Sequence, residues 1–557
     1  MKNKLQFFCI LFMLSQGVFC QVKTPIWGTD TLGYHKIVTD SKDGTILPWY
    51  STDLGKSFDF VIRKIWNFWD TMRTDINGLP YYMNHQVWRG DFDDPRGLGG
   101  DQLMMALSSW RLLYAYSGNE RIKENMKFMA DYYLSHSLSP KNCKWPDLPY
   151  PYNTLVYSGI YDGDMVLGRN FLQPDKAGSF GLELIHLYKM NNNERYPNIT
   201  CSIYLESAIK IANTLAANSN KGDELKSPLP FKVNAINGEI GTLKSHEGKG
   251  EFIILSEYTS AWSSTLEMFL ELIKMKMGNI ELYQQAFDKI LNWMKQYPLK
   301  NNKWGPFFED IPGWSDTQIN AISFAQFIMN HRDLFPEWKS NVKGIFEWVY
   351  NNLGNKEWEK FGVTVVNEQT AYQTPGNSHT SREASAELQY CALTGNNTCK
   401  VNAIRQLSWA TYMVDTDGKN CYPRDENWLS DGYGDYVRHF LKSMSWFPEL
   451  APENKDHILS TTSVIGYVGY KPDFNKTLSV YVESKFLKDA LIYYTTYDEE
   501  SIEQIRLTHK PGKVLQNWQP LSEVDTKGNI GWHWQEMSHG GLLTLHHKGG
   551  KVILISK

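Results

Sequence analysis

The sequence predicts a mostly α-helical chain that ends in an all-β domain. Between about residues 58 and 447, helical segments of two kinds alternate, and from residue 451 the apolar residues recur with a period of two. The chain has 557 residues, of which 42% are hydrophobic and 21% are charged, as is typical of a globular protein with a large core. We therefore expect a large helical domain followed by a smaller domain of antiparallel strands.

The first kind of helical segment is amphipathic and strongly charged. Its apolar residues recur at helical spacing, and Lys and Glu occupy the opposite face. Six segments have this pattern: 58–72, 121–134, 202–215, 280–294, 338–352 and 400–414. We expect them to form an outer layer, with the charged face toward solvent.

The second kind of segment follows each of the first and is richer in small residues. Its six members are 100–116, 178–190, 259–275, 315–329, 380–393 and 434–446. Each comes after a loop dense in Gly, Asp, Trp, His and Arg, whereas the connections back to the first kind are short, as in "SGNE", "KMGN" and "TGNN". Such a repeating unit predicts an (α/α)6 toroid, or barrel, in which six inner helices surround a central cavity and the long loops gather at one end.

The domain boundaries follow from this change of pattern. We expect the helical toroid to span residues 57–450 and an antiparallel β-domain to span 451–557, where segments such as "TLSVYVES" and "KVILIS" are separated by turns. Residues 21–56 are short, polar and Pro-containing, and we expect this N-terminal extension to pack on the toroid.

Residues 1–20 have the pattern of a signal peptide. A basic "MKNK" precedes the apolar "LQFFCILFML" and the cleavage region "SQGVFC". The apolar run is too short to span a bilayer, and no later segment approaches the ~18 apolar residues of a membrane span. We expect the protein to be exported, and periplasmic or secreted after cleavage.

Charge and cysteine content exclude some classes of function. The formal net charge of −4 argues against a general nucleic-acid binder, but a local cluster of Arg and His can still bind an acidic polysaccharide. Cys391 and Cys399 flank the turn "ALTGNNT" and are placed to bridge two antiparallel helices. No Cys or His spacing indicates zinc, and we expect neither a metal nor a cofactor.

The fifth inner segment has an unusual start, "PGNSHTSRE". Thr380 followed by Glu383 fits a capping box, so we expect the helix to begin there. This leaves Asn377, His379 and Arg382 crowded at the entrance to an inner helix without a structural role. In a toroid, that entrance opens on the central cavity, so these side chains would meet residues from other repeats.

One set of residues suits β-elimination from a uronic acid. In "NSH" and "DGYGDYVRH", Asn377 would bind a substrate carboxylate and His379 would take a proton. Tyr433 or Tyr436 would return a proton, and Arg438 would hold negative charge. The C5 proton of a uronate is weakly acidic, so an enzyme must neutralise the carboxylate and stabilise the enolate-like intermediate. Adjacent helical residues diverge by ~100°, so we expect only one of Arg438 and His439 to face the cavity.

Further residues at the same loops are candidates for substrate binding. Arg and His side chains can bind an anionic sugar, and aromatic rings can stack on one. The substrate-binding candidates are His85, Arg89, Tyr258, Trp314, Arg382 and Tyr436.

A second set of residues consists of carboxylates and suits a glycoside hydrolase. Two suitably spaced carboxylates would make an inverting or retaining hydrolase. Acidic residues near helix starts are also favoured as caps and by the helix dipole, which is the alternative reading of each one. The candidates are Asp101, Glu257, Glu309, Asp310, Asp316 and Asp435. A non-catalytic glycan-binding protein would not need so many ionisable groups at one mouth.

With an export signal, a toroid, a β-domain and an Asn/His/Tyr/Arg set, the chain resembles the α/α-toroid polysaccharide lyases of Bacteroidetes-type polysaccharide degraders. The resemblance implies Asn377 as the carboxylate neutraliser and His379 as the base or its helper. It also implies Tyr433 as the proton shuttle and Arg438 as the charge stabiliser. The lyase pattern places its Arg shortly before the Tyr, whereas Arg438 follows Tyr433 and Arg424 precedes it.

The leaving group stays open at this point. A departing sugar makes the enzyme a polysaccharide lyase, and a departing hydroxyl makes it an oligosaccharide dehydratase acting on a terminal uronate. The alternative is a glycoside hydrolase on the same toroid, such as an unsaturated-uronide hydrolase that uses Asp101 or Asp316 as its acid. The expected substrate in each case is an acidic polysaccharide or oligosaccharide.

Overall fold

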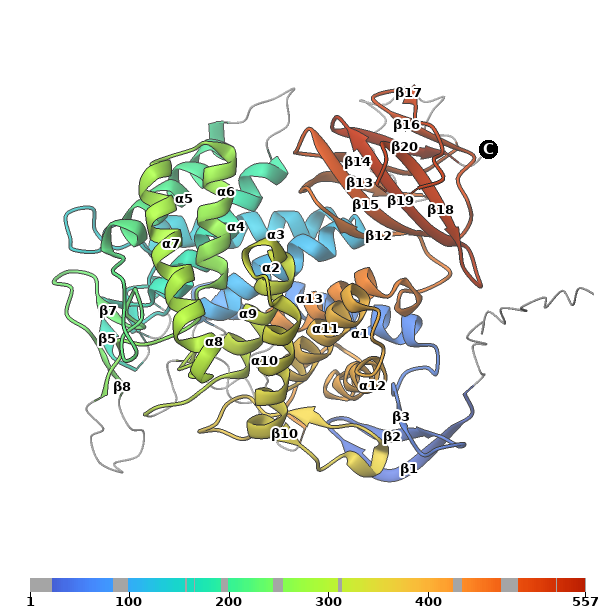
Figure 1. The fold of residues 1–557 in the computed structure, drawn as a ribbon, viewed down its shortest axis with the longest axis horizontal. Coiled ribbons are helices and arrows are strands. Elements are labelled where there is room, and N and C mark those ends of the chain that lie inside the picture. The colour runs from blue at the N-terminus through green and yellow to red at the C-terminus, as the bar shows by residue number, and fades with distance from the viewer. Residues whose placement is uncertain are drawn as a thin grey trace, which may run out of the picture.

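The structure is a computed structural model of a helix-rich chain with antiparallel sheets at its C-terminus, which confirms the predicted class (Figure 1). It describes residues 23–83, 99–155, 158–164, 166–191, 199–243, 254–308, 313–423, 433–471, 489–526 and 528–555. In Figure 1 the helices fill most of the molecule, and the C-terminal strands lie to one side of them. No helix among the described residues is long and apolar enough to cross a bilayer.

Six helices correspond to the charged amphipathic segments. Their apolar spacing is visible in α1, where Val61, Ile65 and Trp69 recur every fourth residue and are all buried. The side chain of Asp53 caps this helix by accepting a hydrogen bond from the Lys56 amide. The six are α1 (Leu54–Asp70), α3 (Glu120–His136), α5 (Ile199–Asn218), α7 (Ile280–Gln296), α10 (Trp338–Leu353) and α12 (Lys400–Ala410).

Six more helices correspond to the small-residue segments, and they form a closed ring. Each contacts the next along the chain, and the last of them, α13, packs against the first, α2. Small residues let these helices approach closely, as at Gly178 of α4, which lies against Thr265 of α6. The six are α2 (Gly99–Ser117), α4 (Pro174–Asn191), α6 (Ser263–Met275), α9 (Gln318–Asn330), α11 (Asn377–Thr394) and α13 (Tyr433–Trp446).

Helix α11 corrects the expected helix start. It begins at Asn377 with Gly376 as its N-cap, so the capping box at Thr380 and Glu383 is wrong. The Thr380 hydroxyl exchanges hydrogen bonds with the Val366 backbone, and the Glu383 carboxyl accepts one from Gln318. Because α11 is covered on nearly every side, both side chains bond to neighbouring elements instead of the helix end. The predicted bridge between Cys391 and Cys399 is confirmed, and it joins the end of α11 to the start of α12.

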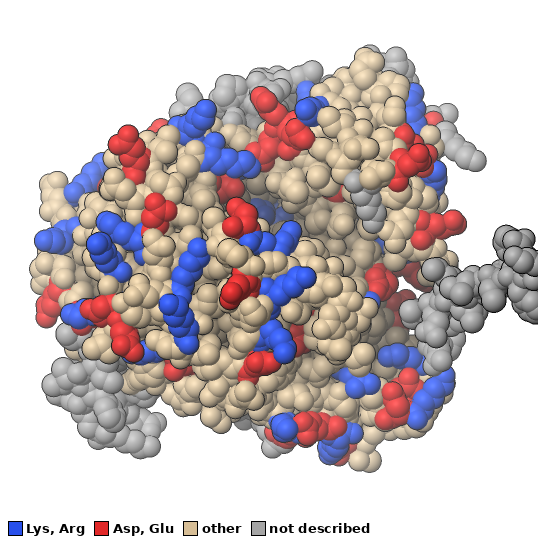
Figure 2. All heavy atoms as spheres, in the orientation of Figure 1, with Lys and Arg blue, Asp and Glu red and all other residues tan. Residues whose placement is uncertain are grey.

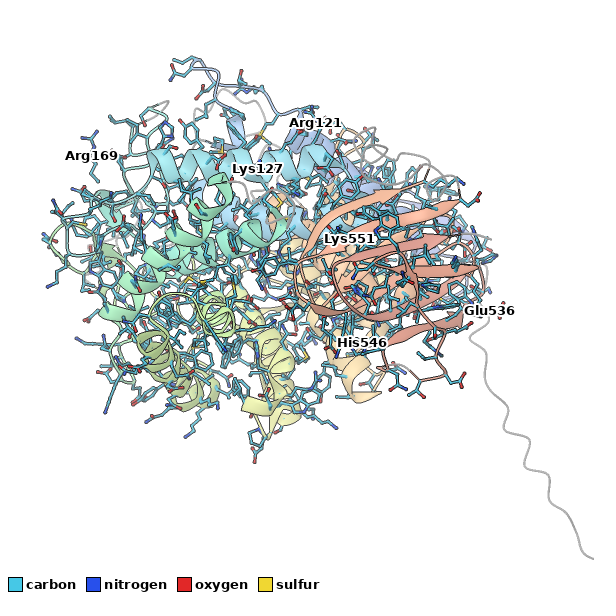
Figure 3. All side chains as sticks on the ribbon, turned by 90° about the horizontal axis from the view of Figure 1, so that it is seen from above. Arg121, Lys127, Arg169, Glu536, His546 and Lys551 are labelled. Carbon is cyan, nitrogen blue, oxygen red and sulfur yellow. A yellow bond between two sulfur atoms is a disulfide. The ribbon has the colours of Figure 1, made fainter. Side chains whose placement is uncertain are left out.

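The C-terminal strands form two antiparallel sheets, and the Tyr494 hydroxyl of one donates to the Glu503 carboxylate of the other over 3.0 Å. Figure 3 labels Glu536 on β18 and His546 on β19, which belong to one sheet, and Lys551 on β20, which belongs to the other. The four-stranded sheet has the order β12 (His457–Thr461), β15 (Glu500–Leu507), β19 (Gly541–Lys548), β18 (Gly531–Glu536). The five-stranded sheet has the order β13 (Ile465–Tyr470), β14 (Ala490–Thr496), β20 (Lys551–Ile555), β16 (Lys513–Gln516), β17 (Gln519–Pro520).

This β-domain is fixed to the last turn of α2. The imidazole of His457 bonds to the Tyr116 carbonyl over 2.9 Å, and the Tyr470 hydroxyl donates to the Ala115 carbonyl over 2.5 Å. The carbonyls at a helix C-terminus have no partner within the helix, so these contacts satisfy groups that would otherwise be buried unpaired. The β-domain therefore lies at the end of the ring where α2 finishes.

The N-terminal strands β1 (Pro25–Leu32), β2 (His35–Asp40) and β3 (Ile46–Leu47) form a small antiparallel sheet against α12. The hydroxyl of Tyr412 accepts from the Val38 amide and donates to the Leu47 carbonyl, so one buried side chain holds two strands.

The long loops carry four two-stranded ribbons: β4 (Gly163–Asp164) with β5 (Gly168–Arg169), β6 (Phe171–Leu172) with β7 (Val233–Asn234), β8 (Thr242–Leu243) with β9 (Ile254–Leu255), and β10 (Gly354–Asn355) with β11 (Val365–Val366). Short helical turns complete the described elements: α8 (Pro298–Asn301), η1 (Tyr81–Met83), η2 (Arg332–Leu334), η3 (Glu359–Phe361), η4 (Thr411–Met413) and η5 (Pro448–Leu450).

Close packing of the ring gives a first prediction. A methyl group at Gly178 would overlap the side chain of Thr265, so Gly178→Ala should destabilise the protein by about 1–3 kcal/mol. Gly344, in the outer helix α10, has open space around it, so Gly344→Ala should stabilise the protein by roughly 0.5–1 kcal/mol. Urea unfolding of the two variants measures both effects. Equal stability of the two variants would contradict the close contact between α4 and α6.

Candidate functional site

The six ring helices enclose a cavity of about 180 Å³. Each helix contributes to its wall, with one example from each: Ser108 of α2, Glu183 of α4, Glu267 of α6, Asn320 of α9, Arg382 of α11 and Lys442 of α13. Most of these side chains are polar, although they lie inside the protein. This space, which has polar walls from all six ring helices, is the candidate functional site.

Asp435, in the first turn of α13, is the centre of the charged groups in this cavity. Its carboxylate is fully buried and forms ion pairs with the guanidinium groups of Arg382 and Arg438. The same carboxylate lies 3.2 Å from Nε2 of His439. One negative charge thus holds two permanent positive charges and a histidine, which leaves an excess of positive charge at the wall.

Both guanidinium groups have further fixed partners. Arg382 donates to Oε1 of Gln318 over 2.7 Å, and Arg438 donates to the Ser108 hydroxyl over 2.8 Å. Burial lowers the pKa of Arg438 to about 10, so it keeps its charge at neutral pH. These contacts orient the guanidinium planes before any ligand arrives.

Lys442 lies one turn further along α13 and also lines the cavity. Its ammonium group donates to Oε1 of Gln326 over 3.2 Å. Burial, together with the positive charges of Arg438 and Arg111, lowers its pKa to about 7. Near neutral pH this lysine therefore exchanges between a charged and a neutral form.

Two buried histidines lie within the same cluster. Burial and the charge of Arg382 hold the pKa of both His379 and His439 well below the usual value, so both are neutral. His439 lines the cavity, whereas His379 packs beside Phe308, with ring centroids 6.0 Å apart. Among the residues that the structure describes, Nδ1 of His439 and Nε2 of His379 have no hydrogen-bond partner.

The expectation that only one of Arg438 and His439 faces the cavity is wrong, because both line it. Side chains on a helix lean toward its N-terminus, so residues three and four positions after Asp435 can both reach its carboxylate. This shared partner draws two adjacent side chains to one side of α13.

The carboxylates on the described cavity wall are paired with cations. Burial would raise the pKa of Glu183, but His186 and Arg111 outweigh it and lower the pKa to about 2. Glu267 lies 2.8 Å from the imidazole of His331. Glu183 therefore carries no proton to donate at neutral pH.

The other carboxylates considered from the sequence have structural partners or lie outside the description. Asp316 accepts three N–H bonds, from the Trp304 and Gly305 amides and the Trp314 indole, so it organises the loop before α9. Glu257 pairs with Lys226 over 2.8 Å. Glu309 and Asp310 lie outside the described residues, and only the backbone of Asp101 is described.

Of the predicted catalytic residues, Arg438 pairs directly with Asp435, and His379 lies near enough to Arg382 for that charge to lower the histidine pKa. Asn377 is close in sequence, but its amide donates to Asn420 over 2.6 Å and accepts from the Ser378 amide. Tyr433 is the first residue of α13, two positions before Asp435, and only its backbone is described.

The predicted substrate-binding residues are more scattered. Arg382 lines the cavity, but Tyr436 is fully buried, packs on Phe440 and donates to the Ala410 carbonyl on the other side of α13. Tyr258 is also buried and donates to the Lys303 carbonyl, while Trp314 packs against it. These contacts place both tyrosines in the core instead of at the described cavity wall. His85 and Arg89 lie outside the described residues.

Sequence reasoning missed Lys442 and underrated His439. Counting from Asp435, the cluster residues of α13 follow at i+3, i+4 and i+7, the spacing of a single helical face. This polar periodicity in "DYVRHFLK" was available from the sequence.

The concentration of positive charge belongs to the cavity and not to the whole molecule. On the face shown in Figure 2, Lys and Arg alternate with Asp and Glu. Pairs such as Arg121 with Asp70 and Lys360 with Asp30 are exposed and balanced. On this face the surface charges are mixed, whereas the positive charges around Asp435 are concentrated at the cavity wall.

No protein-family model and no curated protein sequence matches the chain. Among solved structures, a D-mannose isomerase is 12% identical, with a TM-score of 0.49 over 72% of this chain and 99% of its own. A cellobiose 2-epimerase from Spirochaeta thermophila is 12% identical, with a TM-score of 0.47 over 71% of this chain and 98% of its own. A polysaccharide lyase is 11% identical, with a TM-score of 0.41 over 69% and 95%. Similarity of this degree assigns neither a family nor an activity to the chain.

The Asp435 cluster predicts a large stability effect. Asp435→Asn leaves two buried guanidinium groups without their shared carboxylate, so the free energy of unfolding should fall by about 3–5 kcal/mol. Glu257→Gln, which breaks a half-exposed pair with Lys226, is the matched control and should cost less than about 1 kcal/mol. Denaturant unfolding of both variants measures the difference, and similar losses would contradict the central role of Asp435.

Lys442 predicts a pH-dependent affinity for anions. Because its pKa is lowered to about 7, the lysine is charged below pH 7 and loses that charge above it. Binding of an anionic sugar such as glucuronate should weaken by roughly three- to tenfold between pH 6 and pH 8. Lys442→Met should bind more weakly at pH 6 and lose this dependence. Calorimetric titration at both pH values measures it, and an unchanged pH profile in Lys442→Met would contradict the assignment.

Proposed function

We propose that the chain is a carbohydrate-active lyase that acts by β-elimination on uronic-acid-containing polysaccharide or oligosaccharide. In this proposal the helical ring is an (α/α)6 toroid, and its central cavity binds the uronate. The observation that carries the proposal is the excess of positive charge around Asp435, where Arg438, Lys442 and neutral His439 line one cavity. An anion is the ligand that this charge favours, and a uronate is an anionic sugar.

The chemistry of β-elimination needs three kinds of group, and the cavity supplies two of them among its described residues. Arg438 and Lys442 can neutralise the substrate carboxylate and stabilise the enolate-like intermediate. A neutral histidine can accept the C5 proton. The third group, a proton donor for the C4 oxygen, is assigned to Tyr433 at the start of α13.

We assign Asn377 a different role from the one expected from the sequence. Its amide is already engaged by Asn420 and by the Ser378 amide, and the nearby cations offer a stronger interaction with a carboxylate. We therefore assign neutralisation of the carboxylate mainly to Arg438 and Lys442, with Asn377 supporting the start of α11.

Hydrolysis is the second candidate, and the described wall favours it less. A glycoside hydrolase needs a protonated carboxylic acid beside the glycosidic oxygen. The wall carboxylates Glu183 and Glu267 are paired with cations, and the pKa of Glu183 is about 2. Three buried carboxyl groups do have raised pKa values, and they lie elsewhere than the described wall: Asp175, Glu383 and Glu387.

The leaving group at C4 is either a sugar or a hydroxyl, so the proposal covers a polysaccharide lyase and an oligosaccharide dehydratase. We also propose that the protein is exported after removal of residues 1–20. The proposed helical domain begins at residue 57, and the proposed β-domain begins at residue 451. They rest on the sequence patterns described above.

Absorbance in the near ultraviolet tests the proposal, because elimination creates an unsaturated uronate. The protein is incubated with a panel of uronic-acid polysaccharides and their oligosaccharides, and the product masses are then determined. We expect growth of the unsaturated band with one member of the panel. Arg438→Ala should lower kcat by about 10²–10³-fold, as expected for the loss of one charge-stabilising donor. Tyr433→Phe should also abolish most turnover.

The control is Lys343→Gln in the exposed part of α10, which should leave turnover unchanged. Loss of water without chain cleavage would identify a dehydratase. New reducing ends without the unsaturated band would move the assignment to hydrolysis and contradict the proposal.

A further inference from the structure

We propose that His439 is the general base of the cavity and that Asp435 is its positioning residue. This inference rests on the proposed lyase function and names the group that removes the C5 proton. It differs from the expectation drawn from the sequence, which assigned the base to His379.

The first argument is the tautomer that Asp435 selects. Its carboxylate is held between two guanidinium groups and is therefore ionised, so it can only accept hydrogen bonds. Nε2 of His439 lies 3.2 Å from this carboxylate and must carry the ring hydrogen. The lone pair of a neutral imidazole is then on Nδ1, which is the atom able to take a proton.

The second argument is that this lone pair has no other partner. Nδ1 of His439 is buried and has no hydrogen-bond partner among the described residues, although the side chain lines the cavity. A buried polar atom without a partner is costly unless a ligand satisfies it. The pairing of a carboxylate with one ring nitrogen, leaving the other for the reaction, is the arrangement by which an acid orients a catalytic histidine.

The other basic groups of the cluster have less suitable surroundings. Among the described residues, no carboxylate bonds to the ring of His379: Nδ1 is 3.5 Å from the Ser378 hydroxyl and lies close to Gly376. Lys442 bonds to Gln326 and, when charged, has no lone pair to accept a proton. His439 alone among these described groups combines a fixed tautomer with a place on the cavity wall.

In the proposed β-elimination, the proton at C5 moves to His439 and the C4–O bond breaks. The C5–H bond breaks, and its proton moves to Nδ1 of His439. The electron pair forms the C4=C5 double bond as the C4–O bond breaks, and the departing oxygen takes a proton from the hydroxyl of Tyr433. His439 now carries a positive charge beside Asp435, and its proton returns to the Tyr433 phenolate, directly or through water, which restores both groups.

Substrate binding should also raise the pKa of His439 and so make it a stronger base. Burial and then the charges of Arg382, Arg438 and Lys442 hold the pKa of His439 well below its usual value. A substrate carboxylate that neutralises Arg438 and Lys442 removes part of this effect and raises the proton affinity of the imidazole. The base is thus weak in the empty cavity and stronger when the substrate is bound.

Chemical rescue tests the proposal with full-length protein and the substrate that gives the unsaturated band. In His439→Ala the side chain is replaced by space at the cavity wall, and kcat should fall by about 10²–10⁴-fold. KM should change much less, because Arg438 and Lys442 still bind the carboxylate. Added imidazole should restore part of kcat in a saturable way and in proportion to its neutral form. A purely structural role would not give this rescue.

His379→Ala is the matched control, since it removes a second buried histidine of the same cluster. It should show no rescue by imidazole. His439→Gln keeps a polar side chain of similar size, and it should remain folded by circular dichroism and bind glucuronate with near wild-type affinity while lacking turnover. This variant keeps the test valid if His439→Ala fails to fold.

Near wild-type kcat in folded His439→Gln would overturn the proposal, and so would rescue by imidazole in His379→Ala but not in His439→Ala. Loss of activity in a folded His439→Ala without any rescue would also count against it. Absence of unsaturated product with the wild-type protein is a different result, because it rejects the lyase function before any variant is made.

Discussion

The arrangement of the cavity depends on one buried carboxylate, Asp435. Two guanidinium groups and a histidine from helices α11 and α13 meet at its two oxygens. Without it, Arg382 and Arg438 would repel each other in a medium where charges are poorly screened. Asp435 therefore allows the inner helices to bring positive charge together, and it does so without neutralising that charge completely.

The packing of the ring helices keeps the partners of the Asp435 carboxylate in position. These helices are held together by small residues and apolar contacts with the outer helices, while their inner faces carry hydroxyl, amide and charged groups. Each buried polar side chain then needs a partner from a neighbouring helix, as Arg382 finds in Gln318 and Arg438 in Ser108. These bonds cross from one helix to the next, so the polar interior also fixes the relative rotation of the helices.

Much of the fold was predictable from the sequence, because each helix and strand shows its own periodicity. The charged outer helices and the period-two strands need only local information, and the bridge between Cys391 and Cys399 needs only a short turn. The site was less predictable. Thr380 and Glu383 look like a local cap, but their partners, Val366 and Gln318, come from other elements. Tyr436 follows the same rule, since only the packing of α13 shows that it faces Phe440 and the core.

The basic residues of the cluster also affect one another's protonation, and this effect cannot be read from any one of them alone. Burial lowers the pKa of Lys442, Arg438 and His439, and neighbouring positive charges lower it further. Arg438 keeps its charge at neutral pH, whereas His439 is neutral and Lys442 titrates near pH 7. An anion that enters the cavity relieves all three effects at once, whereas a neutral sugar relieves none. Binding energy for a uronate would thus come partly from relief of repulsion built into the empty site. The same relief strengthens the base beside it, which couples recognition of the carboxylate to removal of the proton.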